Sequence, residues 1–142
     1  MSIMEISAIH RTLQTTTEWL NELREELGHG DPQQNYRMLR AVLTALRDRL
    51  TVEEATDLGA QLPMLIRGMY YEGYNPAKTP TRERDLESFL NHVAANLVPA
   101  QDGDPAEITR AAFKVLQKHV TAGEIHDVKS NLPSEVATAL WP

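Results

Sequence analysis

The sequence predicts an all-α protein: two tandem, pseudo-symmetric four-helix units packed as one compact helical domain, with an N-terminal helical extension. Three observations lead to this fold class. Apolar residues recur at the three- and four-residue spacing of amphipathic helices, and the chain lacks the sustained apolar–polar alternation of strands. The second half of the chain repeats the first half. Signals that start helices recur in both halves, most of them at matching places, although Asp104-Pro105 comes three residues later than Asp31-Pro32 would predict.

The repeat joins residues 17–72 to residues 87–142, which align without a gap at an offset of 70. The residues that are identical in the two copies are, in first-copy numbers, Leu20, Asn21, Leu27, Arg40, Ala41, Leu46, Thr51, Glu54, Asp57, Leu62 and Pro63. Self-similarity at a fixed period identifies a structural unit, so we expect these residues to serve the fold. The predicted division is an N-terminal helical extension at 1–16, a first helical repeat at 17–75 and a second at 76–142.

The opening segment, residues 3–15, carries apolar side chains at helical spacing and lies outside the repeat. The β-branched run at 15–17 suits a helix interior poorly, so a new helix is expected to start there. That helix presents Trp19, Leu23 and Leu27 on one face. It is expected to end at Gly28, which begins a Gly-His-Gly run.

Clear signals start the other helices of the first unit. Asp31-Pro32 supplies an N-cap residue followed by proline at the first helical position. Thr51 with Glu54 predicts a capping box, in which each side chain accepts the backbone N–H of the other residue. Leu62-Pro63 then begins the last helix of the unit.

The second unit is expected to follow the same order. Its helices are predicted to begin near Thr79-Pro80, at Asp104-Pro105, at a second capping box made by Thr121 and Glu124, and at Leu132-Pro133. A loop is expected at 98–103, between the first two of these helices.

Composition excludes several classes of protein. The chain has 142 residues with 42% hydrophobic and 24% charged side chains, as in an ordinary globular domain. It has no cysteine, which excludes disulfides and cysteine-based metal sites or nucleophiles. The absence of a long apolar run and of a signal-peptide pattern predicts no membrane contact and a cytoplasmic location. The net charge of −6 counts against nucleic-acid binding.

The charged residues that recur are predicted to be structural. Arg40 and Asp57, and their repeat counterparts Arg110 and Asp127, are expected to form ion pairs between neighbouring helices; two symmetric anion sites are the alternative. The histidines lack the spacing of a metal-binding helix, although a metal near His119 and His126 stays an alternative. We expect no catalytic residue, no metal and no cofactor.

The junction between the copies differs from the rest of the chain, because three of the four tyrosines fall within five residues there. Tyrosine is apolar in its body and polar at its tip, which suits a contact surface. An ordered linker is one interpretation, and a ligand or partner site is the other. The predicted contact residues of such a site are Arg67, Tyr70, Tyr74, Asn75, Lys78 and Arg82.

Several stretches resemble a bacterial family, the uncharacterised "domain of unknown function" family numbered 2267. The most distinctive stretch runs Gly-Ala-Gln-Leu-Pro-Met-Leu-Ile-Arg-Gly at 59–68, and the similarity covers nearly the whole chain. The resemblance implies a small, all-helical bacterial protein of the cytoplasm. It brings no activity, cofactor or catalytic residue.

The leading functional hypothesis is a non-catalytic helical interaction protein that binds a protein partner or itself, and a homodimer is one form of such self-association. One alternative is an enzyme or small-ligand binder that uses a cleft at the junction of the repeats. A second alternative is a nucleic-acid binder in which 63–71 acts as a recognition helix. That segment carries a single basic residue, Arg67, so nucleic acid is the least favoured partner.

Overall fold

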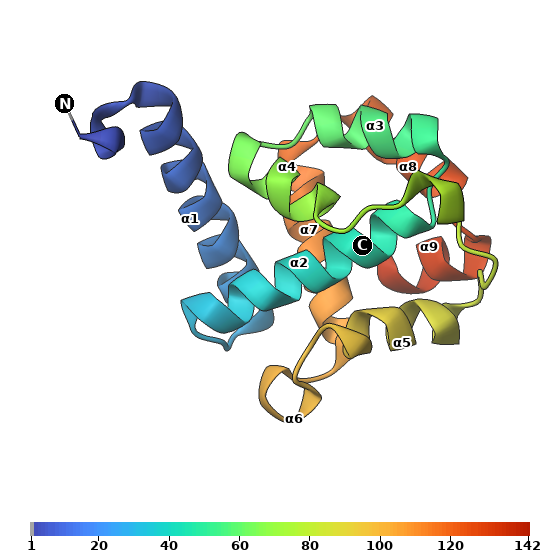
Figure 1. Ribbon diagram of the computed structural model, residues 1–142. Coiled ribbons are helices and arrows are strands. Elements are labelled where there is room, and N and C mark those ends of the chain that lie inside the picture. Colours follow the sequence, from blue (N-terminus) through green and yellow to red (C-terminus); the bar gives the residue numbers. More distant parts are fainter. Residues whose placement is uncertain (1) are drawn as a thin grey trace.

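The computed structural model describes residues 2–142, and every regular element in that range is helical (Figure 1). The elements in chain order are η1 (Ile3–Glu5), α1 (Ser7–Leu27), α2 (Pro32–Asp48), α3 (Val52–Ala60), α4 (Met64–Tyr71), η2 (Pro76–Lys78), α5 (Leu86–Ala95), α6 (Pro99–Asp102), α7 (Pro105–His119), α8 (Ala122–Asn131) and α9 (Ser134–Leu140). The all-α prediction is confirmed. None of the helices in this range has the length and apolar character needed to cross a membrane.

The first helix is longer than predicted. α1 runs unbroken from residue 7 to residue 27, so the expected helix start at 15–17 is wrong. The threonines stay helical because their hydroxyls donate to carbonyls one turn back: Thr16 to Thr12 at 2.7 Å and Thr17 to Leu13 at 2.9 Å. Gly28 ends the helix with a φ of 84°, a left-handed conformation that glycine adopts without a steric penalty.

The predicted Asp-Pro helix starts are confirmed. The carboxylate of Asp31 accepts the N–H of Gln34, and the Gln34 side chain accepts the N–H of Asp31, both at 2.8 Å. Asp104 caps α7 in the same position relative to its proline. The start of α5 differs, because Asp85 caps it and the predicted start near Thr79-Pro80 lies in a turn.

The predicted capping boxes of α3 and α8 form only in part. The hydroxyls of Thr51 and Thr121 accept the N–H of the glutamate three residues on, at 3.2 and 3.3 Å. The reciprocal bonds are replaced by bonds between the two helices: the Thr51 N–H donates to Asn131 Oδ1 at 3.1 Å, and the Thr121 N–H donates to Gln61 Oε1 at 2.9 Å. Each helix start is therefore completed by the other half of the chain, and both glutamate side chains are left free of that role.

The two halves share one core. α2 and α7 cross at the centre of the molecule; α1 packs on α2, α4 and α7, while α5 packs on α2, α7 and α9 (Figure 1). α3 lies against α8. The largest fully buried side chains come from both halves and include Trp19, Tyr70, Phe89 and Phe113. Because each half covers the apolar face of the other, the described residues form one compact helical body with a shared core.

A buried ion pair fixes the loop at 98–103, which contains the short helix α6 where only a loop was expected. The side chain of Asp102 is fully buried and accepts two hydrogen bonds from Arg37, at 2.7 and 2.6 Å. It also accepts the backbone N–H of Val98 at 2.8 Å. The hydrogen bond from the Arg37 guanidinium lowers the pKa of Asp102, so this carboxylate stays charged inside the protein.

Candidate functional site

The tyrosine-rich junction folds around a buried arginine that the sequence reasoning missed. Arg47 is 5% exposed, and its Nη1 donates to the carbonyls of Tyr70 at 2.7 Å and Glu72 at 2.6 Å. Its guanidinium carbon lies 5.4 Å from the centre of the Tyr74 ring, a cation–π distance. The signal that could have found it is its place one turn after Leu43, inside the apolar face of α2.

Two of the predicted contact residues serve the fold. Tyr70 is fully buried, its hydroxyl donates to the Ala55 carbonyl at 2.7 Å, and burial raises its pKa far above the usual range. Arg67 donates to the carbonyls of Gly59 at 2.9 Å and Leu62 at 2.8 Å, at the turn between α3 and α4. The single basic side chain of α4 is thereby engaged within the protein.

The other predicted contact residues lie on the surface of the junction. Asn75 caps η2, and with Lys78 it lines a hollow of about 380 Å³ beside Asp48. Arg82 lines a separate hollow of about 360 Å³ on the neighbouring turn. Lys78 lines both hollows, so the structure brings it beside Asn75 and beside Arg82, and it places Arg67 and Tyr70 elsewhere.

The two expected ion pairs, Arg40–Asp57 and Arg110–Asp127, do not form in the range 2–142. Arg40 pairs instead with Glu72 at 2.9 Å, and Arg110 donates from Nε to a carbonyl near the end of α9 at 3.1 Å. The reason lies in the packing: α3 lies against α4 and α8, so Asp57 faces α8.

The histidine considered as a metal ligand packs on an aromatic ring. His119 stacks on Trp19 with ring centroids 4.7 Å apart, and its Nε2 lies 2.6 Å from a carboxylate oxygen of Glu22. His126 lies apart, on α8, where it lines a shallow surface hollow. The packing thus gives His119 a place between α1 and α7.

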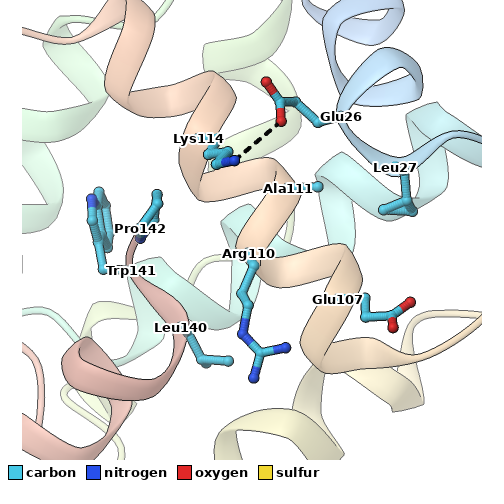
Figure 2. Close-up of a pocket in the computed structure, with 9 residues that line it drawn as sticks. All are labelled: Glu26, Leu27, Glu107, Arg110, Ala111, Lys114, Leu140, Trp141 and Pro142. Carbon is cyan, nitrogen blue, oxygen red and sulfur yellow. Dashed lines mark ion pairs between the residues drawn. The ribbon is translucent and has the colours of Figure 1, made fainter.

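A pocket of about 430 Å³ lies between α1, α7 and the segment that follows α9 (Figure 2). Its lining residues are Glu26, Leu27, Glu107, Arg110, Ala111, Lys114, Leu140, Trp141 and Pro142. The aromatic wall is held in place, because the indole N–H of Trp141 donates to Gln117 Oε1 at 2.7 Å. Lys114 pairs with Glu26 at 3.5 Å across the pocket, as Figure 2 shows.

An exposed apolar surface lies beside the first turns of α1. Ile6, Leu13, Met64 and Leu65 are 42%, 36%, 59% and 38% exposed, and Ile9 is half-buried between the first two. The two helices meet here, because a threonine hydroxyl of α1 accepts the N–H of Leu65 at 2.9 Å. We name these five residues the α1–α4 face. The N-terminal half of α1 stands at the edge of the molecule (Figure 1).

Comparison with known proteins supports the expected relationship. A family model described as an uncharacterized conserved protein, DUF2267, matches residues 16–139 and thus covers both halves of the helical domain. The match begins inside α1 and leaves the earlier turns of that helix outside it. Comparison with curated proteins finds no match. The chain therefore belongs to DUF2267, a family of uncharacterized conserved proteins.

Proposed function

We propose that the protein is a non-catalytic helical interaction protein that associates with a second copy of itself through the α1–α4 face. The observation that carries this proposal is a set of large apolar side chains that are neighbours on the surface of two packed helices. Contiguous exposed apolar area is uncommon on monomers and commonly marks an interaction site.

The second half of the chain has no such face, although it uses the same helices. α5 begins at residue 86, the counterpart of residue 16, so the turns of α1 at 7–15 are an addition to the repeated unit. The counterparts of Met64 and Leu65 are Ser134 and Glu135. The Glu135 carboxylate accepts the N–H at the start of α5. The second copy therefore has polar residues at these two positions, one of which caps a helix, whereas the first copy has exposed apolar residues.

Residues 17–72 and 87–142 can be compared in this way because, as we propose, they are two copies of one unit related by a pseudo-two-fold axis. Matched helix starts support it, since α3 and α8, and α4 and α9, begin 70 residues apart. Matched packing supports it as well. α1 packs on α7, and its counterpart α5 packs on α2. Trp19 stacks on His119, and their counterparts Phe89 and Arg49 also meet, with the Arg49 guanidinium 5.1 Å from the Phe89 ring.

A second copy suits this face because the N-terminal half of α1 is itself an amphipathic helix. Ile6, Ile9 and Leu13 form one stripe, while Arg11 and Glu18 are exposed on the opposite side of the helix. If two such helices pair antiparallel about a two-fold axis, the apolar stripe of each copy is buried against the stripe of the other, and Arg11 and Glu18 stay in water. An isologous dimer needs this kind of self-complementary surface.

The test replaces two residues of the α1–α4 face with the residues found at the matching positions of the second half. Sedimentation velocity across a range of micromolar to millimolar concentrations is expected to show reversible dimerisation of the wild-type chain. The double variant Met64→Ser/Leu65→Glu, which installs the second copy's own residues, is expected to stay monomeric. Val98→Ser is the control, because Val98 is 39% exposed but lies outside the face. A monomeric wild type, or equal dimerisation of all three proteins, would sink the proposal.

A second candidate function, small-ligand binding, is favoured by the pocket in Figure 2. Arg110 and Lys114 lie there beside the apolar wall of Leu140 and Trp141, together with Glu26 and Glu107. A small anion with an apolar body would compete with Glu26 for Lys114 in this pocket. A thermal-shift screen of aromatic carboxylates and phosphates tests this idea. A hit that raises the melting temperature of wild type and of Lys129→Gln, but not of Arg110→Gln, would support it; the absence of any hit would remove it.

A further inference from the structure

We propose a binding site for one hard divalent cation between α3 and α8, formed by the carboxylates of Glu54, Asp57 and Glu124. Each of these residues offers one oxygen, and the three oxygens lie within 4.8 Å of one another. Ligand oxygens that share a cation at about 2.1–2.6 Å from its centre are separated by distances of this order. The three side chains therefore already converge on a point that an ion can occupy.

A buried carboxylate without a partner distinguishes this site from an ordinary acidic surface. Glu124 is only 8% exposed, and its Oε1 is fully buried without a hydrogen-bond donor in the described structure. Oε1 of Glu54 is buried without a donor as well. A buried charge that lacks a counter-charge is strongly unfavourable, so these oxygens call for a cation or a proton.

The surrounding structure explains why no protein group meets this need. In a complete capping box each glutamate would accept the N–H of its capping threonine, but Asn131 and Gln61 take those N–H groups. The nearby hydroxyl of Tyr70 donates its proton to the Ala55 carbonyl. The fold thus directs both glutamates toward each other without supplying a donor.

The charges around Glu124 favour a cation. The carboxylates of Glu54 and Asp57 converge on it and the charge of Asp127 adds to theirs, so the local charge is negative. Asp57 lies on the exposed side, one helical turn after Glu54, so water can complete the coordination there. An all-carboxylate set with an open side suits Ca²⁺, Mg²⁺ or Mn²⁺ and does not suit a soft metal.

The repeat gives the site its place in the fold. Glu54 and Glu124 are counterparts in the two halves, and they meet where α3 packs against α8. A bound cation would join the two halves at this contact. The inference is independent of the α1–α4 face, which involves neither α3 nor α8.

The test is a titration of the full chain with MnCl₂, CaCl₂ and MgCl₂ separately, by calorimetry and by melting temperature, at about pH 8.5 in chelator-treated buffer. We expect saturable binding of one ion per chain, with a rise in melting temperature, for at least one of the three salts. Glu124→Gln is expected to weaken binding at least about 100-fold, since outer-shell changes alone cost about 10–100-fold in affinity. Asp57→Asn, at an exposed position, provides a second ligand variant that keeps the core intact.

Glu53→Gln is the matched control, because Glu53 is exposed on the same helix outside the carboxylate trio, and it should bind like wild type. Circular dichroism checks that each variant is folded. No binding of any of the three salts up to about 10 mM, weaker than the weakest protein calcium modules, would overturn the inference in favour of a proton shared by Glu54 and Glu124. Wild-type affinity in both Glu124→Gln and Asp57→Asn would overturn it too.

Discussion

Replacing Arg47 by methionine should unfold the junction first and weaken the whole domain. Methionine keeps most of the apolar stem but removes two charge-assisted hydrogen bonds, at 2.7 and 2.6 Å, to the carbonyls of Tyr70 and Glu72, and the ion pair from Nε to Asp48 at 3.1 Å. Hydrogen bonds to a charged group are worth about 1.5–3 kcal/mol each. Water can reach the Glu72 carbonyl, which is only partly buried, so losing the hydrogen bond to Glu72 costs less free energy than losing the bond to Tyr70. The expected decrease in the free energy of unfolding is about 3 kcal/mol.

The assay is urea denaturation followed by far-UV circular dichroism, with Arg67→Met as the matched control. Arg67 also donates to two carbonyls, at 2.9 and 2.8 Å, but its side chain is exposed and both bonds are only partly buried, so water can compensate for part of their loss. Its loss should cost about 1 kcal/mol or less. Hydrogen exchange at 72–81 should speed up in Arg47→Met and not in Arg67→Met. Equal effects of the two substitutions would refute the reasoning.

Four further predictions concern the acid range and the helix packing. Asp102 has a lowered pKa, so its contribution to stability is present above its ordinary pKa of 3.8 and is lost as pH falls below it; Asp102→Asn should flatten the acid limb of a pH–stability curve. His92 has a pKa lowered below 6.5 by burial and by Arg49, so stability falls as pH drops below that value, and an NMR titration of His92 checks it. Gly59→Ala should destabilise the fold by about 1–3 kcal/mol, because a Cβ there would lie 2.3 Å from the Tyr71 hydroxyl. Gly68→Ala meets no neighbour within 4 Å and should stabilise α4 by about 0.5–1 kcal/mol, as melting curves of the pair would show.

Helix starts could be predicted from the sequence because their chemistry is local. An aspartate followed by proline gives the same N-cap wherever it occurs, and both instances open helices. The apolar stripes also identified most of the core, since Trp19, Leu39 and Leu43 are all buried. These features depend on residues within one or two turns of each other.

Interactions between distant segments could not be predicted. The capping boxes exchanged partners because α3 and α8 pack against each other, and no spacing within one segment reveals that contact. Arg47 was overlooked because its partners are carbonyls, which every sequence contains. The predicted ion pairs do not form because ion pairing also depends on contacts between distant segments. Arg40 pairs with Glu72, which follows the end of α4, and not with Asp57 on α3.

The α1–α4 face depends on which side chains stay uncovered in the folded protein, and this cannot be predicted from the sequence alone. Its leucine and isoleucine positions on α1 recur at helical spacing, as the sequence shows. In the structure, however, α1 extends beyond the helices that would cover them, and Leu13 stays 36% exposed. The sequence could predict the apolar stripe but not the absence of a neighbour.

The central claim is that this face is where two copies meet, and an NMR dilution series tests it most directly. Amide resonances of the 16.0 kDa chain would be followed from millimolar to micromolar concentration. We predict concentration-dependent shifts confined to residues 5–17 and 63–67. Spectra that do not change on dilution, or shifts that gather on α5, α8 or α9 instead, would contradict the account.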